Sequence, residues 1–125
     1  MQGDACNLPE KFNNYDFIFA GNLIDRLYDP AKFLNLIQNR LRAGGILALT
    51  SPYTWLEEFT DKDKWLGGYK ADTGESFTTL EGIAQTLGEK FKMLDEPMDV
   101  PFVIRETKRK HQHTIAQLSV WQKVE

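Results

Sequence analysis

The fold is decided at Tyr15-Asp16-Phe17-Ile18-Phe19-Ala20-Gly21. This apolar run is almost continuous and ends at a glycine, which predicts a strand covered on both faces, as in a parallel sheet. A helix is expected next, because Asp29 can cap its first turn and Pro30 suits its first position. Gly44 can end that helix in a left-handed conformation. Its apolar side chains recur at helical spacing: Phe33, Leu34, Ile37 and Leu41.

A second buried strand is expected from Ile46 to Thr50. Strand, helix and strand in this order predict a right-handed crossover and a parallel pair. The stretch from Ser51 to Phe77 is long, aromatic and irregular, and a second helix begins at the capping box Thr78-Thr79-Leu80-Glu81. A short strand at 91–94, an irregular stretch rich in proline and charge, and a last strand at 114–123 follow. The pattern is an α/β layer fold.

The composition is that of an ordinary soluble, one-domain globule. Of 125 residues, 42% are hydrophobic and 26% charged, and the formal net charge is -3, which excludes a strongly basic nucleic-acid-binding domain. No apolar run reaches the roughly 18 residues that span a bilayer, and the first twenty residues lack a signal-peptide layout. Cys6 is the only cysteine, so zinc sites built on several cysteines are excluded. A reducing, cytoplasmic setting is therefore expected.

A binding site is expected beyond the carboxyl ends of the strands, where open parallel sheets hold their ligands. Residues 22–27, 51–69 and 96–106 arrive there. Their polar and aromatic side chains suit a small polar ligand with a planar part: Asn22, Asp25, Arg26, Tyr53, Trp55, Glu57, Glu58, Trp65, Arg105 and Glu106. The alternative, that the aromatic members only pack an extra subdomain, stays open.

Other candidate sites carry weaker signals. No glycine-rich phosphate motif occurs, and Gly44-Gly45 is better explained as a helix stop. His111 and His113 lack a third ligand at usable spacing, so a surface pair is favoured over a metal site. The run Lys108-Arg109-Lys110 is interpreted as a solvated turn.

Three segments in the first 50 residues match motifs of one family. Gly3-Asp4-Ala5-Cys6-Asn7-Leu8-Pro9 is similar to an adenine-contacting segment, GDAxxLP. The strand at 15–19, followed by Asn22 and Asp25, is similar to a fourth strand with its exit loop. Leu41-Arg42-Ala43-Gly44-Gly45 is similar to an LxPGG turn, with alanine replacing proline. Together these segments resemble class I methyltransferases that depend on S-adenosylmethionine (SAM).

Four later segments carry a narrower resemblance. They are residues 22–30, 49–60, 65–68 and 101–107, which read NLIDRLYDP, LTSPYTWLEEFT, WLGG and PFVIRET. These segments resemble the 4-mercaptohistidine N1-methyltransferase domain, the C-terminal part of the ovothiol-forming enzyme. The resemblance runs from Gly3 to about Lys123.

The resemblance also implies how much of the domain is present. The family's glycine-rich loop after strand one, and its acidic ribose-binding residue after strand two, have no counterpart here. Strands one to three are then expected to precede Met1, and residues 1–125 form the C-terminal portion of a single methyltransferase domain. From the family's order 3-2-1-4-5-7-6, the chain would keep a Rossmann-like 4-5-7-6 sheet with strand seven antiparallel. The uncovered edge near Phe17–Ala20 would favour self-association.

The resemblance assigns a cofactor, S-adenosyl-L-methionine, to part of the chain. Asp4 would accept a hydrogen bond from the adenine amino group, and the Ala5 backbone N–H would donate to the ring. Cys6 lies in the same segment, and Asn22 and Leu23 would line the cofactor at the strand exit. Because half the site is expected to be missing, the 125-residue chain alone should not hold the cofactor.

The resemblance also assigns a substrate, the imidazole of a thiolated histidine. Tyr53 and Trp55 would hold the ring plane. The substrate ammonium would need a carboxylate, and its carboxylate a cation, which Arg105 would supply. The carboxylate candidates are Glu57, Glu58 and Glu106. No catalytic residue and no metal ligand is assigned.

Two other functions stay open. A methyltransferase acting on another small molecule would share every cofactor motif. A non-catalytic interaction module is the other alternative for a truncated domain. For each of these functions, we expect no nucleic-acid partner and no membrane partner.

Overall fold

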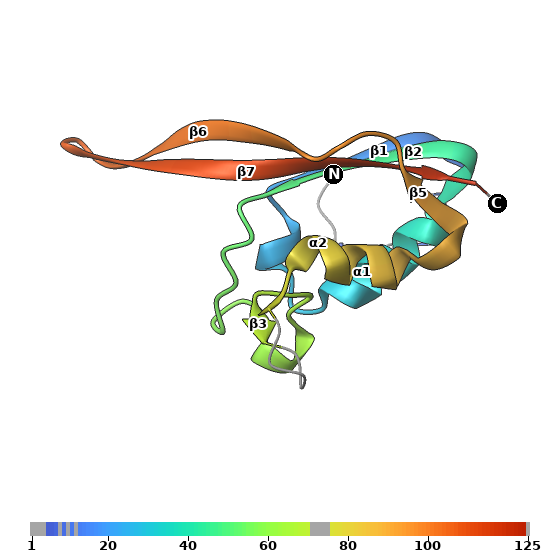
Figure 1. Ribbon diagram of the computed structural model, residues 1–125, viewed down its shortest axis with the longest axis horizontal. Coiled ribbons are helices and arrows are strands. Elements are labelled where there is room, and N and C mark those ends of the chain that lie inside the picture. Colours follow the sequence, from blue (N-terminus) through green and yellow to red (C-terminus); the bar gives the residue numbers. More distant parts are fainter. Residues whose placement is uncertain (1–4, 8, 10, 12, 71–75, 125) are drawn as a thin grey trace.

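The computed structural model describes residues 5–7, 9, 11, 13–70 and 76–124 as a mixed α/β fold (Figure 1). Its two α-helices lie on one side of a curled sheet. The elements are β1 (Tyr15–Gly21), a 3-10 turn (Ile24–Arg26), α1 (Pro30–Arg40), β2 (Leu41–Ser51), a 3-10 turn (Lys62–Lys64), β3 (Tyr69–Lys70), β4 (Ser76–Phe77), α2 (Thr79–Leu87), a 3-10 turn (Gly88–Lys90), β5 (Phe91–Met93), β6 (Met98–Thr107) and β7 (Lys110–Lys123).

The main sheet has the order β1-β2-β7-β5, and β6 also pairs with β7. β1 and β2 are parallel, with Phe17 opposite Ile46, which confirms the predicted parallel pair. β7 is antiparallel to β2, with Leu47 opposite Trp121. Two strands share the other edge of β7, because β5 pairs with its last residues and β6 with its first. β7 therefore pairs directly with every other strand of this sheet except β1.

Both helices begin where the sequence predicts. The Asp29 carboxylate accepts a hydrogen bond from Lys32 N at 3.2 Å, and Thr78 Oγ1 accepts one from Glu81 N at 3.2 Å. The end of α1 differs from the expectation. Leu41 opens β2 instead of closing the helix, and Gly44, at φ 84°, lies within β2 where the register against β1 shifts. Gly44 therefore serves a bulge rather than a helix stop.

The prediction that β1 is covered on both faces is wrong. Ala20 is buried against the helix layer, but Phe17 and Phe19 are 57% and 59% exposed on the opposite, outer face. Both α-helices lie on the inner side only (Figure 1). An apolar run does not reveal whether a second layer exists to cover it.

The irregular stretch expected before Thr114 is also a strand. β6 pairs with β7 from Met98 opposite Leu118 to Thr107 opposite Lys110, so β7 begins at Lys110. The turn between them lies at Lys108 and Arg109, as predicted. We call residues 98–118 the β6–β7 arm, which extends past both helices (Figure 1). Pro101 is tolerated because, among the described residues, β6 pairs only with β7 and leaves its other edge open.

The core lies between the sheet and the helices. Leu34 and Ile37 of α1, Leu47 of β2, Ile83 of α2 and Trp121 of β7 are all at most 5% exposed. Trp55 and Leu66 from the long loop after β2 join this cluster. No helix in the described ranges is long and apolar enough to cross a membrane.

Candidate functional site

The exits of β1 and β2 carry two residues in an unusual backbone conformation. Asn22 follows β1 with φ 51°, and Tyr53 follows β2 with φ 55°. Non-glycine residues in this left-handed region are uncommon, and they concentrate at functional sites. Asn22 N donates to the Thr50 carbonyl at 2.7 Å, so the two exits are directly joined. This edge of the sheet is where the sequence predicts ligand binding.

A buried carboxylate fixes the two exit loops together. Asp25 is 1% exposed, and its Oδ2 accepts a hydrogen bond from Thr54 N at 2.8 Å. Arg26 Nη1 lies 3.5 Å from the same Oδ2 and donates to the Thr54 carbonyl at 2.8 Å. The backbone at residue 54 is thus held through both its N–H and its C=O. The sequence placed Asp25 near the site, but nothing in it indicated burial.

Tyr53 is anchored from a distant strand. Its hydroxyl donates to Gln117 Oε1 at 2.7 Å, and its backbone N–H donates to Ser51 Oγ at 3.0 Å. Burial, and secondarily the Asp25 carboxylate, raise the pKa of Tyr53 to about 12. The phenol is therefore a neutral donor at ordinary pH. Gln117 was not among the residues predicted from the sequence. It shares a face of β7 with the buried residues Ser119 and Trp121, because side chains alternate along a strand.

The two tryptophans of the long loop pack against protein groups. Trp55 is 8% exposed and donates from Nε1 to Thr79 Oγ1 at 2.9 Å. Trp65 donates from Nε1 to the Thr60 carbonyl at 3.0 Å. The rings stack with centroids 6.3 Å apart and planes at 21°. Both indole N–H groups are thus used within the chain, and the pair attaches the loop to α2.

The charged candidates for substrate binding lie in two places. Glu57 and Glu58 are exposed on the turn beside Phe59, whose ring lies 5.0 Å below the Arg26 guanidinium. Arg105 lies opposite His111 in the β6–β7 arm. At about 3.3 Å per residue, that point is roughly 20 Å along β7 from Gln117.

Glu106 also lies at the far end of the arm. Its Oε2 is 3.1 Å from Lys110 Nζ, and the Lys110 side chain is largely exposed, whereas that of Glu106 is 36% exposed. The structure therefore brings neither Glu106 nor Arg105 next to Tyr53.

The residues expected to contact the cofactor lie in different surroundings. Asp4 lies outside the described residues, and Ala5 is half-buried. Cys6 is fully buried, and its thiol lies 3.4 Å from the Asp29 carbonyl as a donor, so its side chain faces the core. Asn22 is exposed and Leu23 half-buried at the exit of β1. Of these side chains, the latter two suit a small polar ligand at this edge.

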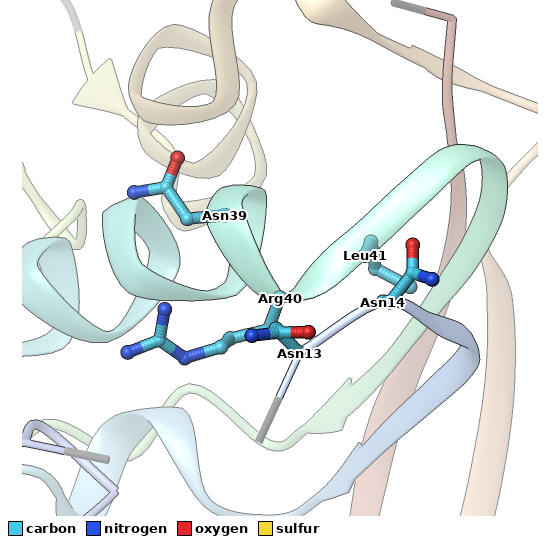
Figure 2. Close-up of a pocket in the computed structure, with 5 residues that line it drawn as sticks. All are labelled: Asn13, Asn14, Asn39, Arg40 and Leu41. Carbon is cyan, nitrogen blue, oxygen red and sulfur yellow. The ribbon is translucent and has the colours of Figure 1, made fainter. Parts of the chain in front are cut away.

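A pocket of about 430 Å³ lies away from this edge, where α1 passes into β2 (Figure 2). It is lined by Asn13, Asn14, Asn39, Arg40 and Leu41. These residues directly precede β1, end α1 and open β2, whereas the ligand edge lies beyond the other end of both parallel strands. The sequence did not predict this pocket. The described residues contain no group of three metal-ligating side chains, and His111 and His113 are exposed.

The comparisons with known proteins identify the fold. No family model and no curated protein matches the chain. A SAM-dependent methyltransferase from Methanosarcina mazei matches 98% of the chain with a TM-score of 0.59 and 18% identity. A SAM-dependent methyltransferase from Thermotoga maritima, described as a possible histamine N-methyltransferase, matches 100% of the chain with a TM-score of 0.53 and 19% identity.

The chain has the fold of SAM-dependent methyltransferases. A third structure matches 97% of the chain with a TM-score of 0.62 and 10% identity. Its description reads "conversion of a disulfide bond into a thioacetal group during echinomycin biosynthesis". The chain spans 54% of that structure, 65% of the Methanosarcina protein and 63% of the Thermotoga protein. At these identities the likeness concerns the fold.

Proposed function

We propose that residues 1–125 are the C-terminal portion of a SAM-dependent methyltransferase domain. The order β1-β2-β7-β5 with β7 antiparallel supports this reading, because it is the order that the 4-5-7-6 half of such a sheet would have. The observation that carries the proposal is the junction of the two strand exits. There Asn22 N donates to the Thr50 carbonyl and Thr54 N donates to Asp25 Oδ2, on the edge where open parallel sheets hold their ligands. Strands one to three of the proposed domain would come from a preceding segment.

The acceptor we propose is an imidazole nitrogen of a thiolated histidine, as in ovothiol formation. The segments around residues 22–30 and 49–60 support it through their resemblance to the mercaptohistidine methyltransferase domain. The Thermotoga structure adds support, because it is described as a possible histamine N-methyltransferase and histamine carries the same ring. Tyr53 would provide the flat surface against which that ring packs.

The mechanism would depend on positioning. SAM supplies a methyl group on a positively charged sulfur, and little covalent help is needed for its transfer. Asn22 and Leu23 would hold the cofactor at the exit of β1, while Ala5 and Asp4 would contact the adenine. Tyr53 would orient the acceptor and not deprotonate it, because its pKa of about 12 keeps the phenol protonated.

The remaining substrate contacts are part of the same proposal. Glu57 and Glu58 follow Tyr53 closely and would receive the amino acid's ammonium. Trp55 would not contact the substrate but would hold the loop after β2 in place through its hydrogen bond to Thr79. Arg105 and Glu106 would take part only when the β6–β7 arm bends toward Tyr53.

A domain-length protein containing this chain tests the proposal. It is incubated with SAM carrying a labelled methyl group and with thiolated histidine, histidine or histamine, and the products are identified by mass spectrometry. We expect N-methylation of thiolated histidine to dominate. Equal turnover of plain histidine would disprove the acceptor but leave the class, whereas absence of both methyl transfer and SAM binding would disprove the class.

One observation favours a second candidate for the isolated chain. Since the chain spans 54–65% of the structures it matches, half a cofactor site would not offset the entropy of fixing a flexible, charged ligand. The 125 residues alone would then act as a non-catalytic interaction module. Calorimetric titration with SAM decides this point, since micromolar affinity would exclude it.

A further inference from the structure

The Arg26 side chain is held in one orientation at the strand exits. Its Nη1 donates to the Thr54 carbonyl at 2.8 Å and to the Asp25 carbonyl at 3.2 Å. Its guanidinium carbon lies 5.0 Å from the centre of the Phe59 ring. All three partners belong to the segments that follow β1 and β2. A guanidinium that is already oriented in this way loses little conformational freedom when it binds a ligand.

These contacts use only part of the guanidinium. Its N–H donors all lie in one plane, and the contact with Phe59 covers a face of that plane rather than its edges. The two carbonyls account for both N–H groups of Nη1. Among the residues that the structure describes, none accepts a hydrogen bond from Nε or Nη2 of Arg26, and the side chain is 39% exposed. Arg26 therefore presents an edge whose two donors match the two oxygens of a carboxylate.

The charges around Arg26 favour a zwitterion over a phosphate. The buried Asp25 carboxylate lies 3.5 Å from Nη1, so the two side chains together carry little net charge. Glu57 and Glu58 are exposed on the turn that also contains Phe59. A doubly charged anion would be repelled by these carboxylates. An amino acid instead brings one carboxylate for Arg26 and an ammonium group for a glutamate.

We propose that Arg26 binds the carboxylate of an α-amino-acid acceptor through Nε and Nη2. This rests on the proposed function, because it names the cation for an acceptor whose ring packs against Tyr53. Thr54, whose carbonyl Arg26 holds, directly follows Tyr53. In a histidine-type acceptor the carboxylate is only a few bonds from the ring, so its cation must lie close to Tyr53. Arg105, roughly 20 Å along the β6–β7 arm, does not meet this condition.

A pair of acceptors tests the assignment. Thiolated histidine and thiolated histamine carry the same ring, but only the first has a carboxylate. Both are assayed, and their binding is measured by calorimetry, with domain-length wild-type and Arg26→Gln proteins. We expect Arg26→Gln to lower kcat/KM for thiolated histidine by about ten- to a hundredfold, mainly through a higher KM, because a charge-assisted hydrogen bond remote from the reacting nitrogen is lost. Thiolated histamine should bind and react almost as it does with the wild type.

Two further variants separate a direct contact from support of the loop. Arg26→Lys keeps the charge but not the planar fork, so it should recover part of the lost affinity for thiolated histidine. Lys62→Gln is the matched control, since it removes a cation that lies 6.0 Å from the Trp65 ring in the same loop, and it should leave both acceptors unaffected. Thermal unfolding checks that all variants are folded. An equal loss for both acceptors in Arg26→Gln would show that Arg26 only supports the loop, and would overturn the proposal.

The other contrary outcomes assign the Arg26 edge or the carboxylate differently. SAM has an α-amino-acid tail of its own, so the SAM affinity of Arg26→Gln should equal that of the wild type. A weaker SAM affinity with an unchanged acceptor KM would assign Arg26 to the cofactor and overturn the proposal. Loss of the preference for thiolated histidine in Arg105→Gln, but not in Arg26→Gln, would also overturn it. Failure of the proposed function is distinguishable, because the wild type itself would then methylate neither acceptor, and this assignment would be wrong with it.

Discussion

The Tyr53 hydroxyl donates a hydrogen bond to Gln117 Oε1 at 2.7 Å across 64 residues of sequence. It joins the loop after β2 to the strand that pairs with β2, and it does so at a residue whose φ of 55° is unfavourable for a large side chain. Ser51 and Asp25 hold the backbone on either side. The conformation at the strand exits is therefore maintained by side chains from three parts of the chain.

Asp25→Asn should lower the pKa of Tyr53. The pKa of Tyr53 is about 12 in the wild type, where burial is the larger cause and the Asp25 charge the smaller. Removing the charge leaves burial, so the value should fall but stay above the usual 10. The measurement is an ultraviolet titration, with a Tyr53→Phe chain subtracted to isolate this phenol. An unchanged titration would show that the carboxylate does not act on Tyr53.

The same shift predicts a loss of stability in alkali. Since the pKa of Tyr53 is raised by folding, its stabilising effect is complete below pH 10 and lost as the pH rises through about 12. Urea unfolding at several pH values should show a decline across this window. Tyr53→Phe should flatten it, and an equal decline in that variant would refute the assignment to Tyr53.

Gly82→Ala should strongly destabilise the protein. A Cβ at Gly82, in the first half of α2, would overlap the Leu66 carbonyl oxygen, a backbone atom that cannot rotate away. Overpacking of this kind costs about 1–3 kcal/mol and often more where backbone must move. Gln85→Ala, on the exposed side of α2, is the matched control and should change little. Thermal unfolding of both variants measures the difference.

Trp55→Phe should cost about 1–3 kcal/mol of unfolding free energy, because it leaves the buried Thr79 hydroxyl without its donor. Thr79→Val removes the other partner. The double variant should cost less than the sum of the two, since the pair interacts directly. Strict additivity in chemical denaturation would mean that the hydrogen bond contributes nothing.

Two substitutions at Asn22 separate its backbone role from its side-chain role. Asn22→Gly keeps φ 51° accessible but removes the amide, whereas Asn22→Ala removes the amide and strains the backbone. If the amide contacts the cofactor, both should weaken SAM binding of the domain-length protein by about 1–3 kcal/mol, and only alanine should also lower stability. Calorimetry and thermal unfolding give the two readouts. Full-strength SAM binding by the glycine variant would remove Asn22 from the site.

The elements with local signals were predictable. A capping residue and proline locate the start of α1, a capping box locates α2, and short joints specify the parallel pair. β6 was not predictable, because Asp99, Pro101 and Arg105 interrupt any strand pattern and its formation depends on pairing with β7. Local sequence carries no information about such a partner.

The candidate site was also predictable only in part. That Asn22 and Tyr53 lie at the exits follows from the order of strands, and the structure joins these exits. The burial of Asp25 and the contact from Gln117 depend on how loops from distant segments fold together. Arg105 lies far from Tyr53 because β6 is long, and the sequence pattern did not predict β6.

β7 is one strand with two environments. Ser119 and Trp121 are buried within the sheet, whereas residues 110–113 are exposed and pair only with β6. Few apolar contacts resist the opening of that outer half, so it can unzip while the inner half stays closed. Amide hydrogens should therefore exchange in a gradient along a single strand, fast near Lys110 and slow near Trp121. The outer end of the β6–β7 arm is therefore expected to open more often than the end that is paired with β2.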